Sequence, residues 1–192
     1  MSKLTWKGGT LLAPAPPALV TVSDGETDNV LTVAWTGIIN SDPPKTYISV
    51  RPTRFSYEIL KKSGVFAINL TTVDLVRACD SCGVYTGRKV DKFKKYKLTK
   101  EKAAQIDCPI IAESPISLEC KVTDVIPLGS HDMFIADILA VDVDESLVDE
   151  SGKLHLEKAR LAAYSHGEYY SLGRKIGSFG FSVKKKTSHG KK

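Results

Sequence analysis

The sequence predicts a mainly β domain with short helices, arranged as a barrel. Short apolar runs rich in β-branched residues recur along the chain and are separated by polar turns. Few long helices are expected, which supports a mainly β domain. A length of 192 residues suits one domain, and 42% hydrophobic with 26% charged residues is an ordinary composition for a domain that buries a core.

The first predicted strands follow a proline-rich entry. Residues 13–17 read Ala-Pro-Ala-Pro-Pro, which is a stiff, extended segment. Residues 18–23 and 30–36 are expected to form two strands joined by the polar turn Asp24-Gly25-Glu26. Residues 46–50 predict a third short strand.

A helix is expected after these strands. Phe55, Ile59 and Leu60 fall on one helical face. Thr53 is a suitable N-cap and Gly64 a suitable C-cap, so the helix should lie between them.

A strand, a second helix and a polar loop come next. Residues 65–70 are nearly all apolar and predict a short strand. Residues 72–78 predict a brief helix with Asp74 in its first turn, where a negative charge is favoured. Residues 83–105 are polar and rich in lysine, so we expect a surface loop with short helical pieces.

Two long strands are expected in the second half of the chain. Residues 116–128 alternate between an apolar and a polar parity. The apolar parity holds Ile116, Leu118, Cys120, Val122, Ile126 and Leu128, and the other parity holds Glu119, Lys121 and Thr123. Residues 133–143 are apolar on both parities up to Asp142. Such a strand is buried on both faces, either inside the fold or by a partner subunit.

The net charge of +5 is concentrated at the C-terminus. Lysines near that end are Lys184, Lys185, Lys186, Lys191 and Lys192. We expect residues 1–186 to form one domain and residues 187–192 a disordered basic tail. The first residues lack the apolar core of a signal peptide, and no run approaches the ~18 apolar residues of a membrane span. We therefore expect a cytoplasmic protein that has no membrane partner, with its four cysteines reduced.

Motifs for several common sites are missing from the sequence. Gly173, Gly177 and Gly180 do not have the spacing of a dinucleotide-binding fingerprint, and no phosphate-binding G-x-x-x-x-G-K-[ST] loop occurs. The four histidines are His131, His155, His166 and His189, and they lack metal-ligand spacing. We therefore expect neither a Rossmann cofactor site nor a metal site, and no nucleophile–base pair is evident.

One C-x-x-C motif, Cys79-Asp80-Ser81-Cys82, admits three interpretations. It could be a redox pair, half of a zinc site, or two structural cysteines. The motif is expected to follow a helix, whereas a reactive thiol favours a helix N-terminus. No second C-x-x-C completes a zinc site. Structural cysteines are therefore the favoured interpretation.

Two segments with strand character indicate a binding site. Trp35 alone is best interpreted as a core residue, but Thr32 and Thr36 place hydroxyls in the same apolar strand, where a ligand could satisfy them. Arg51 and Arg54 follow the next strand directly, and arginine side chains match phosphate oxygens. An apolar surface, hydroxyls and positive charge together suit a flat aromatic ring that carries a phosphate.

With these residues the chain resembles the flavin reductase-like family, whose members have an FMN-binding split barrel, and it is most similar to the flavoredoxin-type members. Seven blocks carry the resemblance, which runs from about residue 11 to residue 186. In order they are NVLTVAWTG (29–37), YISVRPTRFSYEIL (47–60), GVFAINL (64–70), DSCGVYTGRKVDKF (80–93), SPISLECKV (114–122), LGSHDMFIADILAVDVDE (128–145) and YYSLGRKIGSFGFS (169–182). Their shared order and spacing make the resemblance specific.

The resemblance implies a homodimeric split β-barrel with FMN at the subunit interface. The implied cofactor-binding residues are Asn29, Thr32, Ala34, Trp35 and Thr36 for the ring and ribityl chain; Ser49, Val50, Arg51, Arg54 and Ser56 for the ring edge and phosphate; Ser81, Cys82 and Gly83 from the next loop; and Lys92 near the phosphate. His131 is the implied catalytic residue, placing a nicotinamide or substrate. The chain departs from the family pattern at Leu31, Cys79 and Ala136.

The implied activity is an NAD(P)H-dependent reduction of flavin, or of a further acceptor through bound FMN. The flavin supplies the difficult chemistry, so the lack of an acid–base dyad is expected. The acceptor could be a small molecule or a protein, and the choice between NADH and NADPH stays open. One alternative is an FMN-binding electron-transfer protein without its own nicotinamide site. A nucleic-acid-binding barrel is disfavoured, because the strand faces lack basic residues interleaved with aromatics.

Overall fold

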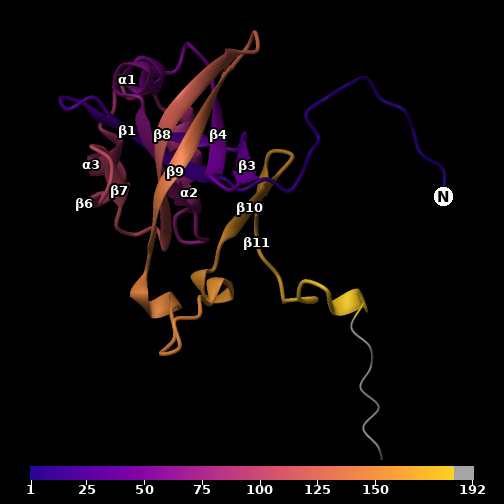
Figure 1. The fold of residues 1–192 in the computed structure, drawn as a ribbon. Coiled ribbons are helices and arrows are strands. Elements are labelled where there is room, and N and C mark those ends of the chain that lie inside the picture. Colours follow the sequence, from indigo (N-terminus) through magenta and orange to yellow (C-terminus); the bar gives the residue numbers. More distant parts are fainter. Residues whose placement is uncertain (184–192) are drawn as a thin grey trace, which may run out of the picture.

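The computed structural model describes residues 1–183. Residues 184–192 lie outside the described part, so the domain boundary after residue 186 and the disordered tail remain predictions. A seven-stranded antiparallel sheet in the order β2-β1-β5-β8-β9-β4-β3 forms the body (Figure 1). Its strands are β1 (Ala18–Ser23), β2 (Asp28–Val33), β3 (Thr36–Ser41), β4 (Pro44–Val50), β5 (Val65–Leu70), β8 (Ile116–Pro127) and β9 (Asp132–Val143). The fold is the predicted mainly β split barrel.

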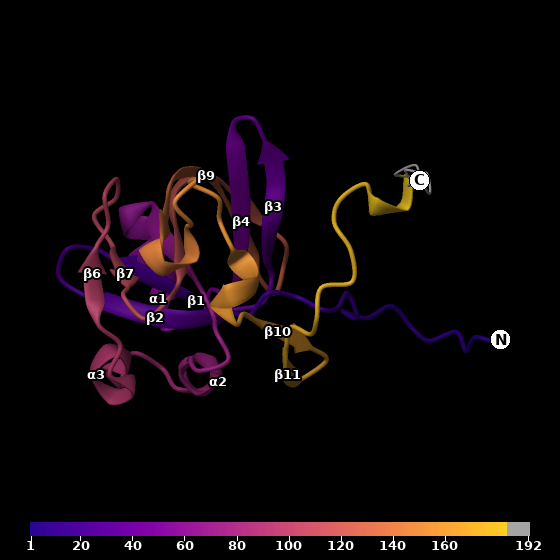
Figure 2. The ribbon, with the colours of Figure 1, turned by 90° about the horizontal axis from the view of Figure 1, so that it is seen from below.

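Smaller elements surround this sheet. Two two-stranded sheets pair β6 (Lys100–Lys102) with β7 (Pro109–Ile111) and β10 (Ala162–Ser165) with β11 (Glu168–Ser171). The helices are α1 (Phe55–Ser63), α2 (Val76–Val84) and α3 (Lys92–Tyr96), with short 3-10 helices η1 (Glu145–Leu147), η2 (Leu156–Ala159) and η3 (Phe181–Val183). The N-terminal segment and the segment after β11 extend from the body on the same side (Figures 1 and 2). No helix within residues 1–183 is long and apolar enough to cross a membrane.

The barrel is not closed by strand pairing, because β2 and β3 are the two edge strands of the sheet and only the turn between them connects these edges. The predicted strand 30–36 is wrong in extent, because β2 ends at Val33 and Thr36 already belongs to β3. The chain turns at Ala34 and Trp35, and the backbone N–H of Ser49 in β4 donates to the Trp35 carbonyl at 2.9 Å. This hydrogen bond continues the β3–β4 ladder, in which Thr36 pairs with Ile48, by one residue. The β3–β4 hairpin, which the sequence did not predict, projects beyond the barrel (Figure 2).

Alternating residues of the strands fill the barrel. The inner core consists of Ala18, Val20, Val22, Leu31, Val33, Ile48, Val50, Phe66, Ile68, Cys120, Phe134 and Ala136, against which α1 packs Tyr57, Ile59 and Leu60. Helix α1 begins after Arg54, whose backbone is extended, so the predicted N-cap Thr53 is one residue early. The predicted C-cap is confirmed: Gly64 takes φ 67° and donates its N–H to the Leu60 carbonyl at 2.9 Å.

Helices α2 and α3 cover the outer side of β1 and β2. The contact is a second buried cluster that includes Leu19, Val30, Leu75, Ala78, Cys79, Cys82 and Phe93. The predicted helix 72–78 is wrong in its position, because α2 starts at Val76. Thr72 forms an antiparallel bridge with Leu161, and residues 73–75 form a turn before the helix begins. The C-x-x-C motif therefore lies inside the helix and does not follow it.

The two longest strands, β8 and β9, agree with their predicted extents. A bulge follows Glu119, and Glu119 on the polar parity is completely buried. On β9, Phe134 and Ala136 face the core, whereas Leu139 and Val141 are 44% and 53% exposed in the single chain. Burial of β9 inside the fold thus accounts for only part of its apolar surface.

Candidate functional site

Three adjoining pockets form one trough along the split of the barrel. The polar pocket, about 300 Å³, is lined by Asn29, Leu31, Thr32, Arg51, Thr53, Arg54, Phe55, Ser56, Cys82, Gly83, Tyr85, Thr86, Gly87 and Lys92. The central pocket, about 270 Å³, is lined by Pro17, Leu31, Thr32, Val33, Ala34, Trp35, Ser49, Val50, Arg51, Arg54, Gly83, His131, Tyr164 and Tyr169. The apolar pocket, about 540 Å³, is lined by Thr10, Leu12, Pro14, Ala15, Pro16, Ala34, Trp35, Thr36, Tyr47, Ser49, Leu128, Ser130, His131 and Met133. Neighbouring pockets share lining residues, so the three pockets adjoin one another.

Lys92 provides buried positive charge at the polar end. Its side chain is only 4% exposed, and Nζ donates to the carbonyls of Val30 at 2.6 Å and Cys82 at 2.7 Å. An ammonium group has three donors, so one N–H remains for a ligand. Burial lowers the pKa of Lys92 to about 8, with the charge of Arg54 adding to this effect and Cys82 opposing it.

The turn that leads into α1 places two arginines at the rim of the polar pocket. The backbone N–H of Arg54 donates to the Arg51 carbonyl at 2.9 Å, which defines the turn. Nη1 of Arg54 donates to the Gly83 carbonyl at 3.1 Å, so its guanidinium lies across the pocket between α1 and the end of α2. Phe55 and Ser56, the first residues of α1, line the same pocket, which therefore lies at the positive end of that helix.

Ser56 and Asn29 line the same pocket as the arginines and are joined to each other by a hydrogen bond. Asn29 Nδ2 donates to Ser56 Oγ at 2.7 Å, and both residues are buried. Because Ser56 Oγ accepts this bond, its own proton is free to donate to a ligand oxygen. The polar pocket therefore combines a hydroxyl donor, guanidinium and ammonium donors, and a helix N-terminus, which is a set suited to a phosphate group.

Two glycines let the backbone approach the site closely. A Cβ on Gly87 would meet the side chain of Phe55 and would lie 2.5 Å from Asn29 Oδ1. A Cβ on Gly83 would lie 3.3 Å from Thr32 Cβ. Gly83 was expected in the site, whereas Gly87 was not, although it lies within one of the quoted sequence blocks. No local sequence signal distinguishes it from an ordinary turn glycine.

The two strand hydroxyls have partners within the protein. Thr32 Oγ1 donates to the Cys79 carbonyl, and Thr36 Oγ1 donates to the Tyr47 carbonyl at 2.6 Å. The expectation that a ligand satisfies these donors is therefore wrong, because carbonyl groups of the protein already accept from both hydroxyls. Both residues nevertheless line the trough, and each hydroxyl can still accept a hydrogen bond.

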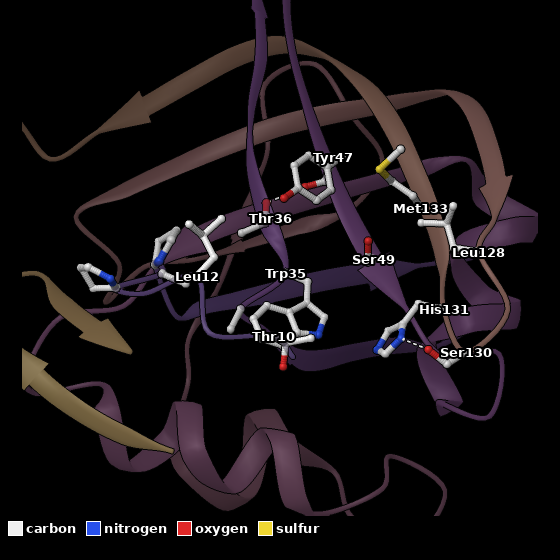
Figure 3. A pocket seen from close by; sticks show the side chains of 14 residues that line it. Thr10, Leu12, Trp35, Thr36, Tyr47, Ser49, Leu128, Ser130, His131 and Met133 are labelled. Carbon is white, nitrogen blue, oxygen red and sulfur yellow. Dashed lines mark hydrogen bonds between the residues drawn. The ribbon is translucent and has the colours of Figure 1, made fainter. Parts of the chain in front are cut away.

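His131 lies where the central and apolar pockets meet. Its Nδ1 lies 2.9 Å from Ser130 Oγ, on the loop before β9 (Figure 3). Burial lowers the pKa of His131, and the charges of Arg51 and Arg54 lower it further. A pKa below the usual value of about 6.5 keeps the imidazole neutral at pH 7.

The structure brings nearly all of the expected site residues into this trough. Asn29, Thr32, Ala34, Trp35, Thr36, Ser49, Val50, Arg51, Arg54, Ser56, Cys82, Gly83, Lys92 and His131 line at least one of its pockets. Ser81 lines none of the three. N-terminal residues between Thr10 and Pro16, and the tyrosines Tyr164 and Tyr169, were missed because they are far from the expected site residues in sequence. Tyr47, Leu128 and Met133 lie close to the expected Ser49 and His131, but no local signal distinguished them from core residues.

The C-x-x-C cysteines have the character of buried structural residues. Cys79 and Cys82 are 0% and 2% exposed. Burial raises the pKa of both thiols, that of Cys82 to about 11, so neither is a thiolate near neutral pH. Within residues 1–183, no group of three or more histidine, cysteine or acidic side chains is placed to hold a metal ion.

Comparison with known proteins identifies the class of this fold and trough. A family model described as a flavin reductase like domain matches residues 11–173. The flavoredoxin of Desulfovibrio vulgaris (Miyazaki F) is 30% identical and superposes with a TM-score of 0.88 over 95% of this chain and 100% of that chain. The fold is that of the flavin reductase-like split barrels, and the chain belongs to the flavin reductase-like family.

Two further relatives are similar over most of their length. An FMN-binding protein from Thermus thermophilus, solved with bound 1-cyclohex-2-enone, is 25% identical with a TM-score of 0.77, over 93% of this chain and 97% of that chain. An NADPH-flavin oxidoreductase of Streptomyces viridifaciens is 27% identical over 153 residues, which cover 78% of each protein.

Proposed function

We propose that the protein is an FMN-binding oxidoreductase that passes electrons from NAD(P)H through bound FMN to an acceptor. One observation carries the proposal: three adjoining pockets lead from one with two arginines and a buried lysine to one that is largely apolar. FMN has the same polarity along its length, with a charged phosphate at one end and a flat, largely apolar ring at the other. The resemblance to an FMN-binding protein and to an NADPH-flavin oxidoreductase supports the proposal.

The residues present fit the phosphate end of FMN. Arg51 and Arg54 would form charge-assisted hydrogen bonds to phosphate oxygens, and Lys92 would contribute its remaining N–H from below. The Ser56 hydroxyl and the first turn of α1 add neutral donors. The close approach at Gly87 leaves no room for a side chain on this wall.

The central pocket fits the ring end. Trp35 is 36% exposed and offers an apolar face, while the turn at Ala34 brings main-chain groups to the same place. Bound FMN would supply an isoalloxazine ring that accepts hydride and passes electrons on. The task of the protein is then to hold the ring and to orient neighbouring groups. Neutral His131, held at Nδ1 by Ser130, is placed to orient a second reactant.

We also propose that two copies form a dimer with FMN at the interface. Four apolar side chains of β3 and β9 remain exposed in the single chain: Ile38, Ile39, Leu139 and Val141. Covering such residues by a second copy would stabilise the dimer through burial of apolar surface. Sedimentation velocity of the FMN-saturated protein measures its mass in solution, and a monomer at high concentration would contradict the arrangement.

Anaerobic mixing with NADPH, and separately with NADH, tests the proposed activity. The absorbance of bound FMN is expected to bleach rapidly with at least one of the two. An FMN-saturated protein that neither nucleotide bleaches would instead support an FMN-binding electron-transfer protein without a nicotinamide site. The similarity to a flavoredoxin is the observation that keeps this second candidate.

FMN affinity is expected to fall as the pH rises through about 8. The pKa of Lys92 is about 8 in the ligand-free protein, and a bound phosphate would stabilise the charged ammonium. Above that pH, binding must first return a proton to Lys92, whereas below it the ammonium is already present. Dissociation constants measured by flavin fluorescence between about pH 7 and 9 check this expectation.

Two controls separate Lys92 from other titrating groups. Riboflavin, which lacks the phosphate, should show a much weaker pH dependence in the same range. The Lys92→Met protein should bind FMN more weakly and without the decline near pH 8. A wild-type affinity that stays constant across this range would show that Lys92 does not serve the phosphate.

A further inference from the structure

The segment after β11 leaves the body of the protein, and we call residues 173–183 the arm. Just before it, the Leu172 N–H donates to the Leu161 carbonyl at 3.3 Å. Within residues 1–183, the backbone hydrogen bonds of the arm itself are internal. The arm ends in the helical turn η3, drawn in yellow, which stands clear of the body in Figures 1 and 2. Beyond its first residue it lies outside residues 11–173, which match the family model.

A local turn gives the end of the arm a defined shape. The Phe181 N–H donates to the Ser178 carbonyl at 2.9 Å, and Gly180 takes φ 77°, a left-handed conformation that glycine adopts readily. A Cβ on Gly177 would lie 2.6 Å from the Phe181 ring, so this ring lies directly against the backbone at Gly177. Phe181 thus closes the turn, while Phe179 within it is left fully exposed.

The arm exposes apolar side chains that its own body does not cover. Ile176, Phe179 and Val183 are 91%, 106% and 82% exposed, and Phe181 is 60% exposed. Single apolar residues scattered on a surface need no explanation, but four within residues 176–183 form a patch that suits an interaction site. Because the turn is already formed, docking of the patch would cost little further conformational entropy.

The same chain also exposes an apolar surface that can receive such an arm. The β3–β4 hairpin projects beyond the barrel, and its Ile38 and Ile39 are 65% and 46% exposed (Figure 2). Neither side chain belongs to a buried cluster of the described residues. Two copies related by a two-fold axis make each contact twice, so one axis would bury both arms and both hairpins.

The available area is sufficient for a stable contact between two copies. A phenylalanine side chain buries about 150–250 Å², so the four phenylalanines of two arms would remove up to about 600–1,000 Å² from water. The surfaces that receive them lose a comparable area. The total then falls in the range of about 1,200–2,000 Å² that is typical of specific interfaces.

We propose that the arm of one copy docks on the β3–β4 hairpin of a second copy, with Phe179 as the main apolar anchor and Ile38 and Ile39 in the surface that receives it. The inference rests on the dimer proposed above and names the segment that holds the two copies together. A lipid surface is the competing partner for an apolar arm, but it would leave the hairpin side chains uncovered. A second copy covers both.

The dimer dissociation constant of the FMN-saturated, full-length protein tests the proposal. Sedimentation at a series of concentrations should give a constant at least about tenfold higher for Phe179→Ser than for the wild type, because a buried aromatic anchor is lost. Leu154→Ser is the control: it removes a 42% exposed apolar side chain outside the arm and the hairpin, and it should leave the constant unchanged.

Two outcomes of these measurements would overturn the proposal. One is an unchanged dimer constant in Phe179→Ser. The other is an unchanged constant together with loss of binding to vesicles of phosphatidylcholine and phosphatidylglycerol, which would assign the arm to a lipid surface.

Photo-crosslinking shows which copy the arm reaches. p-Benzoylphenylalanine replaces Phe179 in a protein that carries a size tag, and this protein is mixed with untagged wild-type protein. Irradiation should join tagged to untagged chains, and mass spectrometry should place the link within residues 36–50. Links confined to a single chain would show that the arm folds back on its own body, contrary to the proposal.

Failure of this inference is distinguishable from failure of the proposed function. If the wild type dimerises and Phe179→Ser dimerises equally well, the arm is wrong and the proposed dimer stands. If the wild type is a monomer at every concentration, the dimer and the arm fail together. Retention of FMN through gel filtration tests the flavin site independently of both.

Discussion

Replacing Arg54 with alanine is expected to weaken FMN binding by about ten- to a hundredfold. Hydrogen bonds to charged groups contribute about 1.5–3 kcal/mol each, and tenfold in affinity corresponds to about 1.4 kcal/mol. Arg54 lines both the polar and the central pocket, and its guanidinium is held across the polar pocket by the Gly83 carbonyl. The dissociation constant of FMN, measured by quenching of flavin fluorescence, checks this prediction.

Two comparisons show whether the loss is specific to the phosphate. Arg77→Ala removes the same charge from an exposed position on α2 that lines none of the described pockets, and it should bind FMN like the wild type. Riboflavin affinity should change little in Arg54→Ala, because riboflavin has no phosphate. Unchanged FMN affinity in Arg54→Ala would refute the phosphate assignment.

Replacing Glu119 with alanine is expected to destabilise the fold by about 3–5 kcal/mol. The carboxyl group is completely buried and accepts backbone N–H bonds from Ala104 at 2.7 Å, Gln105 at 2.6 Å and Ile106 at 3.0 Å. Ile106 is itself buried, and leaving its donor without a partner costs about 1–3 kcal/mol, to which loss of the bonds to Ala104 and Gln105 adds. Urea denaturation of wild-type and variant proteins measures the difference in the free energy of unfolding.

Two further variants, one at an exposed glutamate and one isosteric at Glu119, serve as comparisons for this prediction. Glu150→Ala removes an exposed carboxyl group and should change stability by less than about 0.5 kcal/mol. Glu119→Gln keeps the shape and one acceptor oxygen, but it turns NH₂ donors toward backbone donors, so an intermediate loss is expected. If Glu119→Ala were as stable as the wild type, the three backbone groups would have to find other partners.

Sequence patterns predicted the strands correctly where apolar runs or regular alternation of apolar and polar residues mark the buried side chains. The runs at 18–23, 65–70 and 116–128 match β1, β5 and β8 closely, because apolar side chains enter the barrel or pack beneath the helices. Gly64 was identified as a C-cap because a left-handed residue strongly favours glycine. Arg51 and Arg54 were expected at the site because they directly follow a strand around Pro52, and both line its polar and central pockets.

The remaining features depend on contacts between distant segments. Glu119 belongs to the polar parity of its strand, yet it is buried because residues 104–106 pack over it and need its oxygens. Thr32 and Thr36 were interpreted as ligand donors, but their partners are carbonyls of residues remote in sequence. The apolar pocket likewise needs residues 10–16 to pack beside Trp35, and no local pattern predicts that contact.

The most direct test of the central claim is the visible absorbance spectrum of the purified protein after mixing with FMN and gel filtration. We predict that FMN co-elutes with the protein at a stoichiometric amount and that the flavin absorbance bands are perturbed relative to free FMN. A protein fraction without flavin absorbance, with all FMN eluting in the small-molecule volume, would contradict the account. The trough would then need a different ligand.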